Sequence, residues 1–551
     1  MKNFAIKLSG PAGAGMMQAG EILSKALNRL DFYTLMYPEY PSRIRGGDNN
    51  VLVVFSSEKY IAAVEKIDLL LAFGKENYER HKGEVGGPAF AKATAGKGGK
   101  YEAGELGLNK IAKKLGNPLV ANTAGLGFIF RILGFELRIL EEQIKEEFGK
   151  NQEILKLNLE AVRKGYEVGV SCGLWDVGRV VRVRVGKTIV NLTGNEALVE
   201  GILKADCGFA AIYPMTPINS ILAMLTRSKV QVFRPEDEIA GIMAAIGASY
   251  AGKRAMVATS GGGFSLMIEG MGMAGTAEIP IVIIVGQRTG PSTGMATFSS
   301  QADLNFAIFG GHGEFPRIVL SPGDLKEAFF LGAEAFNLAE HYQVPVILLT
   351  DKYLAESRFS VDKEELEKIR NSVDRGKLVE GFEGDGGFGC KRYEFTKDGI
   401  SPRAFPGQTA FLTNSYEHDE YGFSSDEVEN RKKMMKKRMR KLSGLEGGYG
   451  RYGENGAKTT LVGWGSTKEI ILDFLKDHQE FNYLHIWRPW PFPKEAEEIL
   501  KKSKRIVCVE GNFSGQMADM IERLIFRKVE RVLKDDGRPF FKRELEARLI
   551  K

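Results

Sequence analysis

The sequence predicts a multidomain α/β protein built on doubly wound sheets. Its 551 residues correspond to about three or four domains of ordinary size. Near residues 4, 255 and 459, an apolar strand is followed by a glycine-rich turn and then a helix. That order is typical of units in which parallel strands alternate with helices. Hydrophobic residues make up 43% of the chain, which excludes disorder over most of it.

Residues 1–187 are predicted to form the first domain. The strand Phe4–Leu8 leads into the turn GPAGAG, whose glycines miss the GxGxxG spacing of a dinucleotide site. A nicotinamide-dependent dehydrogenase is therefore not favoured. The later run IDLLLAFG is interpreted as a parallel strand buried on both faces.

Of two glycine-containing segments in this domain, one is a candidate anion-binding loop and the other is not. The loop EYPSRIRGGDNN carries Arg43 and Arg45 beside two glycines, which suits a surface that faces an anion. Residues 86–100 are rich in alanine, glycine and lysine, and we interpret them as a flexible insertion without a chemical role.

Residues 188–370 are predicted to form the second domain. Apolar strands at 254–260, 279–287 and 344–353 alternate with helices. Ligands of open α/β sheets bind at the carboxyl ends of such strands. Arg288 follows the second strand directly, where its guanidinium could bind a carboxylate with two parallel hydrogen bonds. The alternative is an ordinary surface arginine.

Two motifs of the second domain place polar side chains where a helix begins. In YPMTPINSIL two prolines fix the turn, and Thr216 either points its hydroxyl into a cleft or caps the helix. EDEIAGIMAAIGASYAG begins with Glu236, Asp237 and Glu238, and its small residues let a helix or a flat ligand pack closely. Acids at a helix start usually pair with the helix dipole, whereas a buried one is a functional candidate.

The rest of the chain is predicted to form a connector and a last domain. The connector, residues 371–456, is polar and rich in glycine. Its basic run Arg431–Lys441 is interpreted as a solvated helix face, with contact to an anionic partner as the alternative. Residues 457–551 contain the strands TTLVGWGS and RIVCVEGN and are predicted to form a third α/β unit.

Charge, hydropathy and cysteine content exclude several function classes. The net charge of +6 is mild for this length, and no nucleic-acid-binding motif occurs. No apolar run of transmembrane length and no signal-peptide core occurs, so we expect a cytoplasmic protein without membrane contact. The sequence GDG at Gly384–Gly386 lacks the preceding strand of a magnesium–diphosphate loop. An iron–sulfur or zinc site is not predicted, because none of the four cysteines forms a CxxC pair: Cys172, Cys207, Cys390 and Cys508.

The order of the motifs resembles a known enzyme family. YPMTP, EDEIAGIMAAIGASYAG, ATSGGGFSLMIEG and RTGPSTGMAT, followed by GISPRAFPG, EHDEYG, LVGWGSTK, WPFP and VEGNFSGQ, are similar to the α subunit of 2-oxoacid:ferredoxin oxidoreductases. The first ~185 residues are similar to the γ subunit of the same enzymes. The chain therefore resembles the γ–α fusion of the 2-oxoglutarate type. The resemblance implies a γ-type domain at 1–187, a pyrimidine-binding-type domain at 188–370, a connector at 371–456 and a transketolase-C-like domain at 457–551.

The resemblance implies a reaction and its partners. The family oxidatively decarboxylates a 2-oxo acid with coenzyme A to give acyl-CoA and CO2, and passes the electrons to ferredoxin. We expect 2-oxoglutarate as substrate, while pyruvate and branched-chain 2-oxo acids remain alternatives. Thiamine diphosphate is shared with a β subunit that carries Mg2+ and [4Fe-4S], so we expect an (αβ)2 assembly. A non-catalytic assembly or ligand-binding subunit is the alternative from a different class.

The same resemblance assigns site residues. Glu238 is the candidate that hydrogen-bonds the aminopyrimidine ring of thiamine diphosphate, with Glu236 as second choice. Arg288 is expected to bind the substrate carboxylate. The remaining assignments are hydrogen bonds to substrate or cofactor for Thr216 and Thr297, cofactor contact for Tyr213 and Pro214, and contact with substrate or coenzyme A for Arg43 and Arg45.

Overall fold

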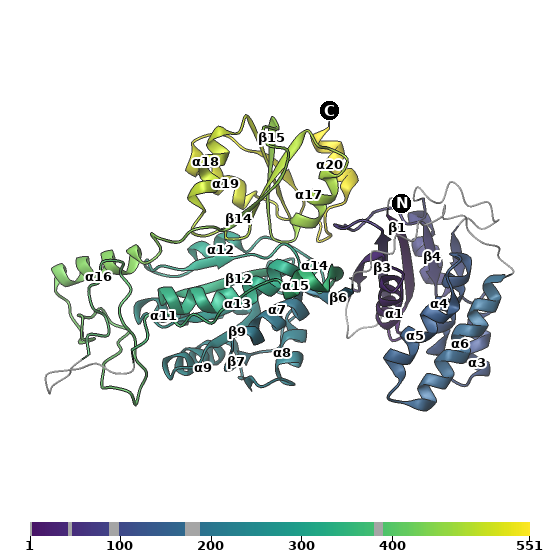
Figure 1. Ribbon diagram of the computed structural model, residues 1–551, viewed down its shortest axis with the longest axis horizontal. Helices are drawn as coiled ribbons and strands as arrows, with labels where there is room; N and C mark the ends of the chain where they lie inside the picture. Colours follow the sequence, from purple (N-terminus) through teal and green to yellow (C-terminus); the bar gives the residue numbers. More distant parts are fainter. Residues whose placement is uncertain (1–2, 42–46, 87–98, 171–187, 380–389, 551) are drawn as a thin grey trace. The chain divides into compact units, whose positions relative to one another are not determined.

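The computed structural model describes residues 3–41, 47–86, 99–170, 188–379 and 390–550 (Figure 1). Arg43, Arg45, Cys172, the sequence GDG and most of the predicted insertion lie outside these ranges. The chain forms two compact units. The first contains residues 1–193, 356–367 and 540–551, and the second contains 194–355 and 368–539. No helix in the described ranges is long and apolar enough to cross a membrane.

The first unit is built on a seven-stranded sheet with the order β5-β4-β1-β3-β2-β13-β6. β1 pairs with β4 in parallel and with β3 in antiparallel fashion. The run IDLLLAFG contains β4, all of whose residues are buried. The strands are β1 (Phe4–Pro11), β2 (Tyr33–Glu39), β3 (Asp48–Ser56), β4 (Leu69–Ala72), β5 (Lys100–Glu102), β6 (Ile189–Thr193) and β13 (Arg358–Asp362).

Helices cover this sheet, and two of them approach unusually closely. A Cβ added at Gly165 of α6 would lie 1.8 Å from the Ala124 carbonyl oxygen of α4, so only glycine permits this packing. The helices of the unit are α1 (Met16–Asn28), α2 (Lys75–His81), α3 (Leu108–Lys114), α4 (Val120–Ile132), α5 (Leu137–Phe148), α6 (Gln152–Val170), α15 (Lys363–Glu367) and α20 (Lys542–Leu549).

The second unit contains a parallel six-stranded sheet with the order β11-β12-β10-β9-β7-β8. Its central strands are buried on both faces, as the continuous apolar runs predict. The strands are β7 (Phe209–Ile212), β8 (Gln231–Phe233), β9 (Ala255–Ser260), β10 (Ile281–Gln287), β11 (Ile318–Leu320) and β12 (Pro345–Asp351). The helices are α7 (Gly194–Lys204), α8 (Asn219–Leu225), α9 (Glu238–Tyr250), α10 (Gly261–Leu266), α11 (Ile268–Thr276), α12 (Leu304–Phe309), α13 (Leu325–Tyr342) and α14 (Lys352–Glu356).

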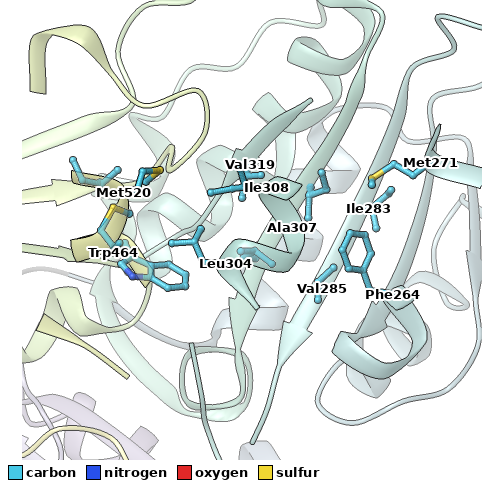
Figure 2. Packing of buried hydrophobic residues seen from close by; sticks show 14 of the residues in the cluster. Phe264, Met271, Ile283, Val285, Leu304, Ala307, Ile308, Val319, Trp464 and Met520 are labelled. Atoms are coloured by element: carbon cyan, nitrogen blue, oxygen red, sulfur yellow. The ribbon is translucent and has the colours of Figure 1, made fainter. Parts of the chain in front are cut away.

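A five-stranded C-terminal sheet, in the order β14-β16-β15-β17-β18, shares a core with the six-stranded one. Figure 2 shows Trp464 and Met520 of the C-terminal layer beside Leu304 and Val319. The exposure of Trp464 is 0%, so the two layers pack directly against each other at this point. The elements are β14 (Tyr449–Gly453), β15 (Thr459–Trp464), β16 (Phe481–Ile486), β17 (Arg505–Glu510), β18 (Glu530–Leu533), α17 (Thr467–Leu475), α18 (Lys494–Lys502) and α19 (Gln516–Ile525).

The connector carries α16 (Val428–Arg440), which contains most of the basic run. Lys432, Lys433 and Lys436 are exposed, as the prediction of a solvated face requires. For Lys437 and Lys441 that prediction is wrong, because both side chains are buried and form ion pairs with the buried carboxylate of Glu278, each with an N–O distance of 2.7 Å. Burial is tolerated because each charge has a partner of opposite sign.

Candidate active site

The candidate site lies at the carboxyl ends of β7, β9 and β10, which parallel pairing places at one edge of the sheet. The YPMTP turn follows β7, and Arg288 follows β10. The Nη1 group of Arg288 donates a hydrogen bond of 3.0 Å to the carbonyl oxygen of Thr216 and so joins the two turns. Thr216 does not cap α8, because the N-cap position is occupied by Ile218.

Glu238 is the buried acid among the three that begin α9. Its exposure is 4%, whereas Glu236 is exposed. Asp237 occupies the N-cap position and accepts a hydrogen bond of 2.8 Å from the backbone N–H of Ala240. Asp237 therefore caps the helix, as expected of an acid at a helix start, and Glu238 is the buried acid that is a functional candidate.

The Glu238 carboxylate is buried and incompletely bonded. Its Oε1 atom has no hydrogen-bond partner among the described residues. A Cβ added at Gly263 of α10 would lie 2.3 Å from this oxygen, so glycine leaves the space in which the carboxylate sits. Because buried polar atoms are normally paired, Oε1 is available to accept a hydrogen bond from a ligand.

The charge of Arg288 acts on the carboxylate of Asp303, a residue that the sequence did not single out. Burial lowers the pKa of Arg288, and the negative charge of Asp303 offsets this effect. Desolvation raises the pKa of Asp303 to about 6, against the opposing effect of the Arg288 charge. Asp303 precedes α12, but its side chain makes no capping bond to that helix. Because an acid directly before a helix is usually a cap, the sequence pattern alone does not mark Asp303 as a site residue.

The loop between Arg288 and Asp303 folds back on itself. The backbone N–H of Thr289 donates to the Phe298 carbonyl oxygen at 3.1 Å, and that of Met295 donates to the Thr289 carbonyl oxygen at 2.9 Å. Thr297 is partly buried in this loop.

The VEGN motif of the C-terminal sheet fixes the end of this loop. The side chain of Gln301 donates to the Trp464 carbonyl oxygen at 2.7 Å and accepts from the Gly511 N–H at 2.8 Å. The side chain of Asn512 donates to the Gln301 carbonyl oxygen at 3.1 Å. The last domain therefore holds the segment that carries Asp303. The Gln301 contacts are long-range, and the sequence pattern gave no signal for them.

Known proteins match the chain over its whole length. A family model described as "Pyruvate flavodoxin/ferredoxin oxidoreductase, thiamine diP-bdg" matches residues 200–437, and one described as "Pyruvate ferredoxin/flavodoxin oxidoreductase" matches residues 5–168. The alpha subunit of the 2-oxoacid:ferredoxin oxidoreductase of Sulfolobus sp is 33% identical over 99% of this chain and 96% of its own length. This chain belongs to the 2-oxoacid:ferredoxin oxidoreductase family.

Two further relatives bear on the substrate class. A solved structure of the 2-oxoglutarate:ferredoxin oxidoreductase from Magnetococcus marinus, with 2-oxoglutarate, coenzyme A and succinyl-CoA bound, has a TM-score of 0.89 and 30% identity and covers 100% of this chain and 99% of that chain. The 2-oxoglutarate synthase subunit KorA of Methanothermobacter thermautotrophicus is 35% identical over 60% of this chain and 90% of its own length. The predicted α/β fold and the predicted reaction class are confirmed, and the chain is an oxidoreductase subunit of this family.

The thiamine-diphosphate-binding family model spans all the candidate residues of the second unit. The structure joins Arg288 to the Thr216 turn, buries Glu238 beside Gly263 and leaves Tyr213 exposed. Arg43 and Arg45 are outside the described residues, so their assignment stays a prediction. Among the described residues no group of three or more His, Cys, Asp or Glu side chains could hold a metal ion.

Exposed apolar side chains continue from the candidate site along α9. Ile239, Met243 and Tyr250 are 51%, 39% and 37% exposed, and Leu266 of α10 is 48% exposed. The spacing of these residues on α9 puts them on one side of the helix. Large exposed apolar patches mark interaction surfaces.

Proposed function

We propose that this chain supplies the α side of a thiamine diphosphate site that oxidatively decarboxylates 2-oxoglutarate with coenzyme A. The observation that carries the proposal is the buried Glu238 carboxylate, whose Oε1 has no partner and lies where Gly263 leaves space. The bound 2-oxoglutarate, coenzyme A and succinyl-CoA of the Magnetococcus marinus enzyme support the choice of substrate. Pyruvate and branched-chain 2-oxo acids are the alternatives within the same chemistry.

The residues at the site fit thiamine diphosphate. Glu238 would share a proton with a ring nitrogen of the aminopyrimidine: it donates from Oε1 when it holds the proton, and Oε1 accepts when the proton is on the ring. Thr216, Thr297 and the exposed Tyr213–Pro214 edge would contact the cofactor or the substrate beside it. When bound, the cofactor supplies an electron sink for decarboxylation.

Arg288 would anchor the carboxylate of the 2-oxo acid. Its Nη1 is bonded to the Thr216 carbonyl oxygen, which holds the guanidinium in place. The other N–H groups of the guanidinium have no hydrogen-bond partner among the described residues. They could therefore bind a carboxylate with two parallel hydrogen bonds, which fixes its orientation as well as adding strength. Its position at the end of β10 is where ligands of parallel sheets bind.

The complete enzyme needs a second subunit. We assign Mg2+ and [4Fe-4S] clusters to a β subunit, ferredoxin as electron acceptor, and an (αβ)2 assembly. The exposed stripe of α9 begins beside Glu238 and supports a partner that covers the cofactor site. Arg43 and Arg45 stay candidates for contact with coenzyme A or the substrate.

The test compares two neighbouring glutamates in the complex purified with its β subunit. Glu238→Gln keeps the shape of the side chain and removes its charge, and we expect it to lower 2-oxoglutarate turnover by about 100-fold or more. Glu236→Gln, at an exposed position of the same helix start, should stay close to the unchanged enzyme. Size-exclusion chromatography checks that both complexes assemble. Full turnover of an assembled Glu238→Gln complex would show that Glu238 has no catalytic role.

A further inference from the structure

A small cavity lies between the end of α9 and the connector. Its volume is about 10 Å³, which is room for one water-sized group. Two arginines of the connector, Arg392 and Arg403, line it, and no acidic side chain is among the described residues that do so. The rest of the lining is mainly apolar, and Tyr250 of α9 and Phe411 of the connector meet in it with ring centroids 5.9 Å apart. The cavity therefore has cationic and apolar walls.

Arg392 is buried without an acidic partner. It is 3% exposed, and its Nη1 and Nη2 groups donate to Oε1 of Gln343 at 2.9 Å and to the backbone carbonyl oxygen of Glu278 at 2.7 Å. Both acceptors are neutral, and no ion pair joins Arg392 to an acid in the described part of the chain. The carboxylate of Glu278 already pairs with Lys437 and Lys441. A buried charge without a counter-charge is costly, so the site favours an anion.

Arg403 shares one acidic partner with two other arginines. Glu340 forms ion pairs at 2.9, 2.8 and 2.8 Å with Arg254, Arg375 and Arg403. Arg403 is 4% exposed, and its Nε atom has no hydrogen-bond partner among the described residues. Burial lowers the pKa of Arg403 to about 10, against the opposing effect of the Glu340 charge. One carboxylate cannot neutralise three guanidinium groups, so positive charge remains beside the cavity.

The size and the charge of the cavity together select a small anion. A water molecule fits the space but leaves the excess positive charge uncompensated. Carboxylate, phosphate and sulfate ions carry the right charge but exceed the room for one water-sized group. A halide ion is a single sphere of nearly the required size. It suits the weakly hydrated guanidinium group, and hydrogen bonds between charged partners are the strong ones.

We propose that this cavity binds one chloride ion, held by the Nε–H group of Arg403 and by the charge of Arg392. The site is structural and is independent of the proposed function. The ion would join the connector to the end of α9, the helix that begins with Glu238. Because the unfolded chain has no such cavity, binding stabilises the folded state as the chloride concentration rises.

Thermal unfolding of the purified full-length chain measures this stabilisation. Sodium chloride replaces sodium gluconate stepwise up to about 200 mM at constant ionic strength, because gluconate is too large for the cavity. We expect the melting temperature to rise by about 2 °C and then to level off, as binding at a single site requires.

Two arginine variants separate the cavity from the protein surface. Arg403→Met removes the free N–H donor and the charge and keeps a side chain of similar length. Whatever its melting temperature in gluconate, the rise with chloride should disappear. Arg370→Met is the matched control, because Arg370 is an exposed arginine of the same unit, and it should keep the full rise. No rise in the unchanged chain, or an equal rise in Arg403→Met, would overturn the proposal.

A crystal structure locates the ion and does not depend on a variant that folds. Crystals of the unchanged chain with bromide in place of chloride, at the same concentration, should give an anomalous difference peak in the cavity beside Nε of Arg403. An ordered water at that position, or bromide at other positions only, would overturn the proposal. Either result leaves the proposed function intact, because that function depends on Glu238 and Arg288.

Discussion

At the residue scale, the site depends on positions where a side chain is missing. Gly261 and Gly263 make room for Asp303 and Glu238, and each acid lies in a different segment of the chain. The sequence singled out the triple glycine and the acids before α9 as separate motifs. It could not show that Glu238 reaches Gly263, because that contact depends on how α9 packs on β9 and α10.

Gly263→Ala should disable the site without unfolding the chain. The new methyl group would lie 2.0 Å from Thr259 Oγ1 and 2.3 Å from Glu238 Oε1, so the carboxylate must move. We expect the affinity for thiamine diphosphate and the turnover of the αβ complex to fall at least about tenfold, since small displacements of catalytic groups are costly. Both are measured by titrating the cofactor in an activity assay.

Gly262→Ala is the matched control for this change. A Cβ at Gly262 would meet no atom within 4 Å, and alanine favours a helix by about 1 kcal/mol over glycine. It should therefore keep the activity and slightly raise the melting temperature. Equal activity in the two alanine variants would contradict the placement of Glu238.

At the element scale, strands and helices could be predicted where the local sequence pattern determines them. Which strands pair with each other could not be predicted. The continuous apolar runs of β9, β10 and β12 correctly indicated buried parallel strands. In contrast, β13 pairs with β2 through Arg358 and Met36, which are separated by more than half the chain. Period and composition carry no information about such a partner, so the sheet order needed the structure.

The basic helix α16 shows the same limit. Its basic composition indicated a solvated helix face. The ion pairs of Lys437 and Lys441 with Glu278 could not be predicted, because the carboxylate is far away in the sequence. Arg392 donates to the Glu278 carbonyl oxygen at 2.7 Å and ties a second connector segment to the same residue. This buried cluster fastens the connector to the rest of the second unit.

Lys437→Met tests that role. The change leaves the buried Glu278 carboxylate with one lysine instead of two, and losing one partner of a buried pair typically costs about 3 kcal/mol. We expect the melting temperature of the chain to fall by about 5 °C or more in scanning calorimetry. Lys436→Met, at an exposed position of the same helix, should change it by less than about 1 °C. A similar small shift in both variants would mean that the buried pair does not stabilise the connector.

At the scale of the whole molecule, composition and motif order were the informative signals. Family membership rested on the sequence of motifs from YPMTP to VEGNFSGQ, and the full-length relatives confirm it. The first unit also contains residues 356–367 and 540–551, so the chain comes back to this unit twice after leaving it. No local sequence pattern predicts these two returns. The Gln301 contacts show that the last domain also supports the site of the second unit.

We expect this chain, together with its β subunit, to oxidise a 2-oxo acid with coenzyme A. The direct test is anaerobic reduction of a viologen dye by the αβ complex with thiamine diphosphate and Mg2+, with 2-oxoglutarate, pyruvate and a branched-chain 2-oxo acid in parallel. We predict reduction that requires coenzyme A and is fastest with 2-oxoglutarate. No reduction with any of the three acids, from a complex shown to hold its clusters and thiamine diphosphate, would mean that the chain does not catalyse this reaction on them.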